Sequence, residues 1–297
     1  MNNSVFPSAL HSSIRELDEE VLRWAWSAGL FESPAELERC RIQKINWFAG
    51  YLFPGESAEK LRLTIRFFLC LFLLDDLLDQ ISESESFGFL RGLMLGSVQS
   101  EIPRLQNLGS ELILTHELLG NSSSSAQWRK EWLDIWTFYI SGLNWEVKNK
   151  TWGQKPDLED YRYHRPSSSG VFLAIHLIRP DLATKVCEAE LLEHAIARLI
   201  CLSNDLASFE KELAIGDFHN ELIILQPTMG DQVKSWAAME IRSIQKRIHI
   251  LASSVASHSD SCRSWVESLF LLVGGCLAWS EETTRYVSYV NGTLRAN

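Results

Sequence analysis

Three aspartates lie at the end of an apolar stretch in the first third of the chain. The segment LFLLDDLLDQ contains Asp75, Asp76 and Asp79. On a helix, Asp75 and Asp79 lie one turn apart on the same face, and Asp76 lies about 100° around the axis. Carboxylates this close repel one another unless a cation neutralises them, and Mg²⁺ prefers hard oxygen ligands together with a substrate phosphate. The motif is therefore compatible with a metal site, and a solvated helix end is the alternative.

A second set of oxygen donors recurs at helical spacing in LSNDLASFEKE. Asn204, Ser208 and Glu212 are four positions apart, so on a helix they form a ladder on one face that is roughly 12 Å long. Their amide, hydroxyl and carboxylate oxygens together can chelate one divalent ion. A polar stripe facing water is a weaker explanation, because Glu and Lys are favoured over Asn and Ser on solvated helices. Lys211 lies beside the ladder and could reach an anion.

Composition and charge restrict the class of protein. The formal net charge of the 297 residues is −10, which argues against a nucleic-acid partner, since such binding needs a basic face. The six cysteines form no CxxC pair, so they indicate reduced thiols. Residues 1–10 lack the features of a signal peptide, and the longest apolar run, 67–74, is too short to span a bilayer. We therefore expect a cytoplasmic protein with no membrane span.

Helical periodicity runs through nearly the whole chain, and alternating strand patterns hardly appear. The first acids close a helix that begins near residue 57. Further helices are expected at 87–98, 101–120, 126–149, 188–214, 227–257 and 261–289. Loop-like breaks are expected at 121–125, 153–156 and 164–170. None of these breaks is long enough to be a domain linker. The sequence thus predicts one all-α domain over 1–297, with a flexible start at 1–12 and a central apolar cavity.

Both acidic motifs resemble those of class I terpene synthases of the microbial type. DDLLD at 75–79 is similar to the aspartate-rich motif of the family, and NDLASFEKE at 204–212 is similar to its second metal motif. The GDFHN segment at 216–220 also resembles the microbial branch. Such a resemblance implies a helical bundle that binds three Mg²⁺ ions between the two motifs, with Mn²⁺ as a substitute.

Two arginine-containing segments extend the resemblance to residues 67–286. RYHRPSSSG resembles the segment that holds the family's diphosphate-sensing arginine, which matches Arg165, and ETTRYVS resembles the C-terminal Arg-Tyr pair, which matches Arg285 and Tyr286. In relatives, a linker residue and a residue with a substrate-facing carbonyl follow the sensor. We assign Ser168 as the linker. The carbonyl donor is Ser169 or Gly170.

The chemistry implied by this resemblance is the ionisation and cyclisation of a linear isoprenoid diphosphate. Breaking an allylic C–O bond separates a carbocation from diphosphate, and fixed positive charge on the leaving group lowers the barrier. The resemblance implies that Arg165, Lys211 and Arg285 donate charge-assisted hydrogen bonds to the diphosphate, and that Tyr286 donates a neutral one. Released diphosphate can accept the final proton, so no dedicated base is required.

A carbocation also needs a dry cavity, and aromatic faces stabilise positive charge without reacting. Core packing is the alternative role for each aromatic side chain. The candidates for the substrate pocket are Phe67, Phe68, Phe72, Trp145 and Trp279.

The family and the chain length favour the C15 substrate farnesyl diphosphate, followed by the C20 geranylgeranyl diphosphate of a diterpene cyclase. A chain-elongating prenyl diphosphate synthase is disfavoured, because it normally carries two aspartate-rich motifs. A helical isoprenoid-binding protein without activity is a further alternative. A monomer or a homodimer are both compatible with the sequence.

Overall fold

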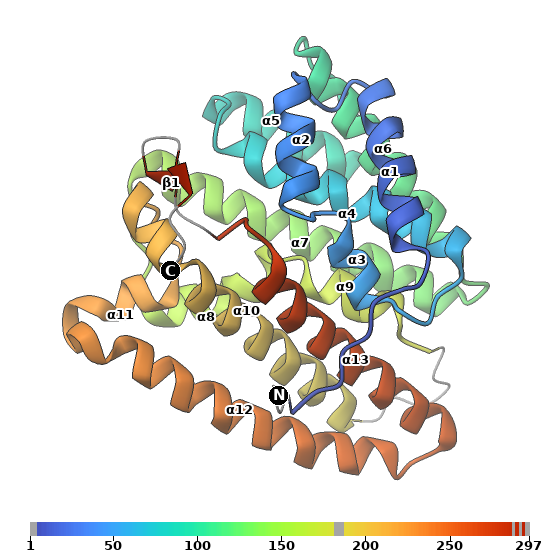
Figure 1. Cartoon of the computed structure of the whole chain (residues 1–297), viewed down its shortest axis with the longest axis vertical. Coiled ribbons are helices and arrows are strands. Elements are labelled where there is room, and N and C mark those ends of the chain that lie inside the picture. Colours follow the sequence, from blue (N-terminus) through green and yellow to red (C-terminus); the bar gives the residue numbers. More distant parts are fainter. Residues whose placement is uncertain (1–4, 181–186, 287–288, 291–292, 295–297) are drawn as a thin grey trace.

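The computed structural model describes residues 5–180, 187–286, 289–290 and 293–294 as a bundle of α-helices (Figure 1). The helices and strands in chain order are α1 (Ile14–Ser27), α2 (Pro34–Ile42), α3 (Trp47–Leu52), α4 (Ala58–Leu78), α5 (Glu83–Leu95), α6 (Pro103–Gly120), α7 (Ala126–Trp152), α8 (Leu158–Ser168), α9 (Val171–Leu177), α10 (Cys187–Ile215), α11 (Glu221–Met229), the 3₁₀ turn η1 (Gly230–Gln232), α12 (Val233–Ala256), α13 (Asp260–Glu282), β1 (Tyr289–Val290) and β2 (Thr293–Leu294). The prediction of an all-α fold is confirmed, with β1 and β2 as a two-residue antiparallel pair.

The helix that carries the first acids is apolar on most of its surface. The Ser57 side chain starts α4 by accepting a hydrogen bond from the backbone N–H of Lys60 at 3.2 Å. Because apolar side chains surround its axis, α4 packs against α1, α3 and α6 and lies inside the bundle. In Figure 1, α1, α2, α5 and α6 gather on one side of the molecule, while α11 and α12 lie on the opposite side.

Two hydrophobic clusters form the core. The first draws its side chains mainly from α1 to α7 and the second mainly from α9 to α13. Ile178 and Ile200 pack against both clusters. A cavity lies where the clusters meet, because its lining combines Leu71 and Tyr139 from the first with Val171 from the second. The two halves of the bundle therefore enclose the cavity between them.

The first difference from the predicted elements lies at Pro166. The expected break at 164–170 is mostly helical, since α8 continues through Pro166 to Ser168. A proline costs one backbone hydrogen bond, which a helix can lose close to its end. The break falls at Ser169 and Gly170, and the φ of +70° at Gly170 suits a residue without a Cβ.

The predicted helix at 227–257 is wrong in its first turn. Pro227 lies inside α11, and the break falls at Gly230, where φ is +54°. The last long helix ends at Glu282, before the predicted end at residue 289. Residues 287–288 of that prediction, and residues 1–4 of the predicted flexible start, lie outside the described residues. Within the described ranges, we find no helix with the length and apolar character to cross a membrane.

Candidate active site

A cavity of about 250 Å³ extends inward from the ends of α4 and α10. Its polar end is partly exposed and forms the mouth, whereas its apolar end is buried and forms the floor. The polar side chains at the mouth are Asp75, Asp76, Asp79, Glu146, Lys150, Arg165, Asn204, Lys211, Glu212, Asp217, His219, Arg285 and Tyr286. The aromatic and apolar side chains of the floor include Phe48, Leu52, Phe68, Leu71, Phe72, Tyr139, Ala174, Ile200, Leu272, Cys276 and Trp279.

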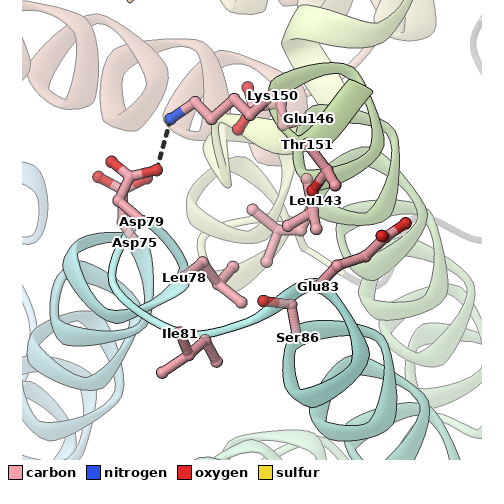
Figure 2. Close-up of a pocket in the computed structure, with 11 residues that line it drawn as sticks. Asp75, Leu78, Asp79, Ile81, Glu83, Ser86, Leu143, Glu146, Lys150 and Thr151 are labelled. Atoms are coloured by element: carbon pink, nitrogen blue, oxygen red, sulfur yellow. Dashed lines mark hydrogen bonds and ion pairs between the residues drawn. The ribbon is translucent and has the colours of Figure 1, made fainter. Parts of the chain in front are cut away.

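The aspartates of α4 form one wall of the mouth, and cations from distant parts of the chain neutralise them. Arg285 Nη2 donates to Asp75 Oδ2 at 3.1 Å and to Asp76 Oδ1 at 2.9 Å. Lys150 Nζ pairs with Asp79 Oδ1 at 2.6 Å, as Figure 2 shows. The like charges predicted from the motif are thus balanced by an arginine and a lysine.

Asp75 is the most perturbed acid of this wall. Its side chain is 60% exposed, but this surface faces the cavity, and the surrounding protein still withdraws the carboxyl from bulk water. This burial raises the pKa of Asp75 to about 6; the positive charge of Arg285 opposes the shift, and the negative charge of Asp76 adds to it. Perturbed pKa values of this kind cluster at functional sites.

The donors of α10 form the opposite wall and are held by a buried asparagine. Asn220 is fully buried, and its Nδ2 donates to Glu212 Oε2 at 2.7 Å and to the backbone oxygen of Asp205 at 2.7 Å, with Ser208 Oγ at 3.4 Å. Ser208 Oγ donates to the backbone oxygen of Asn204 at 2.9 Å. Burial raises the pKa of Glu212 to about 7, against the lowering effect of the Asn220 hydrogen bond.

Arg165 and Tyr286 both contact the first residue of this ladder. Arg165 Nη2 donates to Asn204 Oδ1 at 2.8 Å, and Asn204 Nδ2 donates to the Tyr286 hydroxyl at 2.7 Å. Arg165 Nε also donates to Asp205 Oδ1 at 3.1 Å, while Tyr161 donates to the other Asp205 oxygen at 2.7 Å. Asp205 is buried, so it fixes the direction of the arginine. Three residues predicted from separate motifs therefore meet at one point.

The segment after the arginine lines the same cavity. Gly142 allows α7 and α8 to approach closely, since a Cβ there would lie 2.5 Å from the backbone nitrogen of Ser168. Ser168, Ser169 and Gly170 all face the cavity. The Gly170 carbonyl accepts the N–H of Leu173 at 3.1 Å and is committed to α9. Ser169 is then the better of the two predicted carbonyl donors.

Three of the five predicted aromatic residues line the floor. Phe68, Phe72 and Trp279 do so, and Phe48, which the sequence did not single out, packs edge-on against each of them at centroid distances of 5.5, 5.3 and 4.9 Å. An aromatic wall of four rings results.

The other two predicted aromatic residues lie outside the cavity lining. Phe67 is fully buried against Trp132 and Trp136, because it occupies the opposite face of α4. Trp145 instead stacks on His164 at 4.8 Å and donates to Asp160 at 3.1 Å. For Phe67 and Trp145 the geometry therefore supports packing, the alternative role.

Four polar residues of the mouth were missed by the sequence analysis. Asp217 and His219 belong to GDFHN, a segment noted only for its resemblance. Glu146 and Lys150 are spaced i, i+4 on α7, a pattern that usually marks a solvated ion pair. Only their position beside α4 and α10 identifies them as part of the mouth.

The two walls suit a divalent metal ion. Asp75, Asp76, Asn204 and Glu212 present carboxylate and amide oxygens to one cavity, which are the ligand atoms that Mg²⁺ prefers. Among the described residues, no three His, Cys, Asp or Glu side chains converge on one point. The first wall is directed instead at Arg285 and Lys150.

The architecture is that of known terpene synthases. A solved structure of a cucumene synthase variant superposes with a TM-score of 0.80 at 23% identity, covering 96% of this chain and 99% of that chain. The (+)-eremophilene synthase of Sorangium cellulosum is 23% identical over 98% of this chain and 93% of the relative. The 4-epi-cubebol synthase of Streptosporangium roseum, a (2E,6E)-farnesyl diphosphate cyclizing enzyme, is 24% identical over 95% of this chain and 90% of the relative.

The family itself follows from a match over more than half of the chain. Residues 66–241 match the family model described as terpene synthase family 2, C-terminal metal binding. This chain belongs to that family. It is a class I terpene synthase, a lyase that acts on an isoprenoid diphosphate and uses divalent metal, as the resemblance implied.

Proposed function

We propose that this enzyme ionises farnesyl diphosphate with the help of three Mg²⁺ ions and cyclises the carbocation to a sesquiterpene hydrocarbon or alcohol. The observation that carries the proposal is the cavity, which places two walls of oxygen donors and the cationic side chains of Lys150, Arg165, Lys211 and Arg285 above an aromatic floor. The farnesyl substrate is supported by the 4-epi-cubebol synthase, whose name specifies that diphosphate.

The residues proposed to hold the metal are Asp75 and Asp76 on one wall and Asn204, Ser208 and Glu212 on the other. When bound there, divalent ions supply positive charge that stabilises the leaving diphosphate. Metal binding requires both carboxyl groups with raised pKa, those of Asp75 and Glu212, to lose their protons. Asp79 is proposed as a further ligand, and its Oδ1 is paired with Lys150 in this structure.

The residues proposed to bind the diphosphate are Arg165, Lys211, Arg285 and Tyr286, all of which line the mouth. The arginine forks match phosphate oxygens, and the hydrogen bond to Asp205 would keep Arg165 in place when the Asn204 oxygen turns to a metal ion. When the allylic C–O bond breaks, both electrons leave with the diphosphate oxygen, and the positive charge remains on the isoprenoid chain. Ser169 would direct its carbonyl at that charge.

The floor is proposed to shape and protect the carbocation. Phe48, Phe68, Phe72 and Trp279 present a continuous aromatic wall, which can stabilise the cation without forming a bond to it. The reaction ends when the cation loses a proton, for which the released diphosphate is the nearest base, or when it captures water. Burial of the floor keeps premature capture low.

The test is to incubate the protein with C10, C15 and C20 diphosphates and Mg²⁺, and to analyse volatile products and released diphosphate. We expect cyclic C15 products, loss of turnover in EDTA, and recovery with Mg²⁺ or, in part, Mn²⁺. Cyclic products from the C20 substrate alone would make the enzyme a diterpene cyclase. Longer linear diphosphates made from C5 and C10 substrates would instead identify a prenyl diphosphate synthase, and the absence of diphosphate release would leave an isoprenoid-binding protein.

We further propose that residues 1–297 act as one catalytic domain in the cytoplasm, as a monomer or homodimer. Light scattering of the purified protein decides between the two oligomeric states.

A further inference from the structure

Lys150 occupies a position between the two acidic motifs. It lies near the end of α7, with its side chain 33% exposed, and reaches across to the end of α4 (Figure 2). Its Nζ pairs with Asp79 Oδ1 at 2.6 Å and with Asp217 Oδ2 at 3.1 Å. It also lines the cavity. One ammonium group thus neutralises two carboxylates that are far apart in the sequence.

The two carboxylates belong to different walls of the mouth. Asp79 is the last acid of the α4 motif. Asp217 lies in the turn after α10, where its backbone N–H donates to the Glu212 carbonyl at 3.0 Å. The same turn leads to Asn220, which holds the Glu212 carboxylate. Through its two ion pairs, Lys150 therefore connects the end of one metal-binding motif to the end of the other.

The balance of charges at the mouth indicates that this connection affects metal binding. Among the described residues, six carboxylates line the cavity, against four lysine and arginine side chains. Three of those cations already pair with carboxylates, namely Lys150, Arg165 and Arg285. A divalent ion that enters alone must compete with these resident charges for the same oxygens. If a diphosphate enters with the metal, the resident cations acquire phosphate oxygens as new acceptors.

We propose that Lys150 is an internal counter-cation, a positioning residue that acts through Asp79 and Asp217 and keeps metal binding weak until a diphosphate is present. The inference rests on the proposed function, because it assigns this lysine a role in how that site loads. The proposed role predicts that loss of Lys150 changes the affinity for two ligands in opposite directions. Without Lys150, Mg²⁺ alone binds more tightly, and pyrophosphate with Mg²⁺ binds more weakly.

Calorimetric titration of the full-length enzyme tests both predicted changes in affinity. For Lys150→Met, we expect the Kd of Mg²⁺ alone to fall about fivefold to tenfold, and the Kd of pyrophosphate in saturating Mg²⁺ to rise by a similar factor. Lys150→Arg keeps the charge and should restore both constants to within about twofold of wild type.

The matched control is Lys148→Met, two positions earlier on α7. Lys148 is exposed, lies over the Trp152 ring at 4.7 Å and does not line the cavity, so its loss changes the net charge equally. Both Kd values should stay near wild type. Thermal melting in EDTA verifies that each variant is folded. If Lys150→Met fails to fold, Lys150→Gln takes its place.

Unchanged or weaker binding of Mg²⁺ alone in Lys150→Met and Lys150→Gln would overturn the inference. So would a Lys148→Met variant that behaves in the same way. Failure of the proposed function is a separate result: the wild-type protein would release no diphosphate from any isoprenoid substrate, whereas the titrations need no turnover.

Discussion

The two walls of the cavity carry the same kind of ligand atom, yet they are held in different ways. On α10, hydrogen bonds fix the donors: Asn220 reaches Glu212 from eight positions away, while Arg165 and Tyr286 contact Asn204 from 39 and 82 positions away. On α4, the carboxylates are held by ion pairs with residues far along the chain. Lys150 is 71 positions from its partner Asp79, and Arg285 is 209 positions from its partner Asp76. Asn220 is fully buried, whereas the Asp79 side chain is 51% exposed.

This difference indicates which wall can change. A buried polar network is costly to disturb, since an unsatisfied buried donor costs about 1 to 3 kcal/mol. Exposed ion pairs contribute about 0 to 1 kcal/mol and can be exchanged for other partners. The α10 wall is therefore a preorganised half of the site. The α4 wall is the half whose contacts are expected to change when metal and diphosphate bind.

The largest effect should come from removing one donor from each wall. Asp75→Ala and Asn204→Ala should each lower kcat by about 100-fold or more, as expected for a group that stabilises developing charge. Both variants should remain folded. They should differ in stability, because Asn204→Ala also removes partners from Arg165 and Tyr286 at a cost of about 1 to 3 kcal/mol.

Diphosphate release and thermal melting measure these effects. Wild-type rates in either variant would refute the site assignment. Equal losses of Tm in Asp75→Ala and Asn204→Ala would show that the two walls do not differ in how strongly their donors are held.

An intermediate effect is expected at Asn220, the residue that supports the α10 wall. Asn220→Ala should weaken binding of Mg²⁺ with pyrophosphate about 10-fold to 100-fold, which is typical when a residue supporting a metal ligand is lost. It should also lower stability, because the side chain caps α11 through the N–H of Leu222 at 2.8 Å.

Ser125→Ala is the control, since Ser125 caps α7 by accepting from the N–H of Trp128 at 3.2 Å. It should lose about 1 kcal/mol of stability and keep wild-type metal affinity. If both variants bind metal alike, Asn220 supports only its helix.

The smallest effect is the pH dependence of the metal-free protein. The pKa of Glu212 is about 7 in the folded protein, above the ordinary value of 4.5, so the folded state binds this proton more tightly than the unfolded state. Stability in EDTA should therefore fall as pH rises from about 4.5 to 7 and then level off, by on the order of 1 kcal/mol after solvent screening.

Denaturant unfolding at a series of pH values measures this slope. Glu212→Gln should reduce the slope, to which Glu193 also contributes because burial raises its pKa to about 7. Asp75→Asn should reduce it less, since Asp75 has a pKa of about 6 and a more exposed side chain. If Asp75→Asn reduced the slope of stability against pH more than Glu212→Gln does, the α4 wall rather than the α10 wall would be the buried one.

Much of the site was predictable because helical spacing is a local property. The four-residue steps of Asn204, Ser208 and Glu212 place them on one face whatever surrounds them. The resemblance then added Arg165 and Arg285 as diphosphate-binding residues, and in the structure they contact the two walls. Local signals failed where they were ambiguous.

A proline such as Pro166 can start, end or sit within a helix, so the break before Gly170 was placed too early. The apolar helix α4 gave no indication of which phenylalanine faces the cavity, because both of its faces are apolar.

The sequence by itself determined the helices, the two sets of oxygen donors and the family. Only the tertiary structure decided that Phe48 joins the aromatic wall, that Phe67 and Trp145 pack elsewhere, and that Lys150 joins Asp79 to Asp217. The physical reason is that periodicity fixes which residues share one helix face. What that face meets depends on how helices from distant parts of the chain pack together.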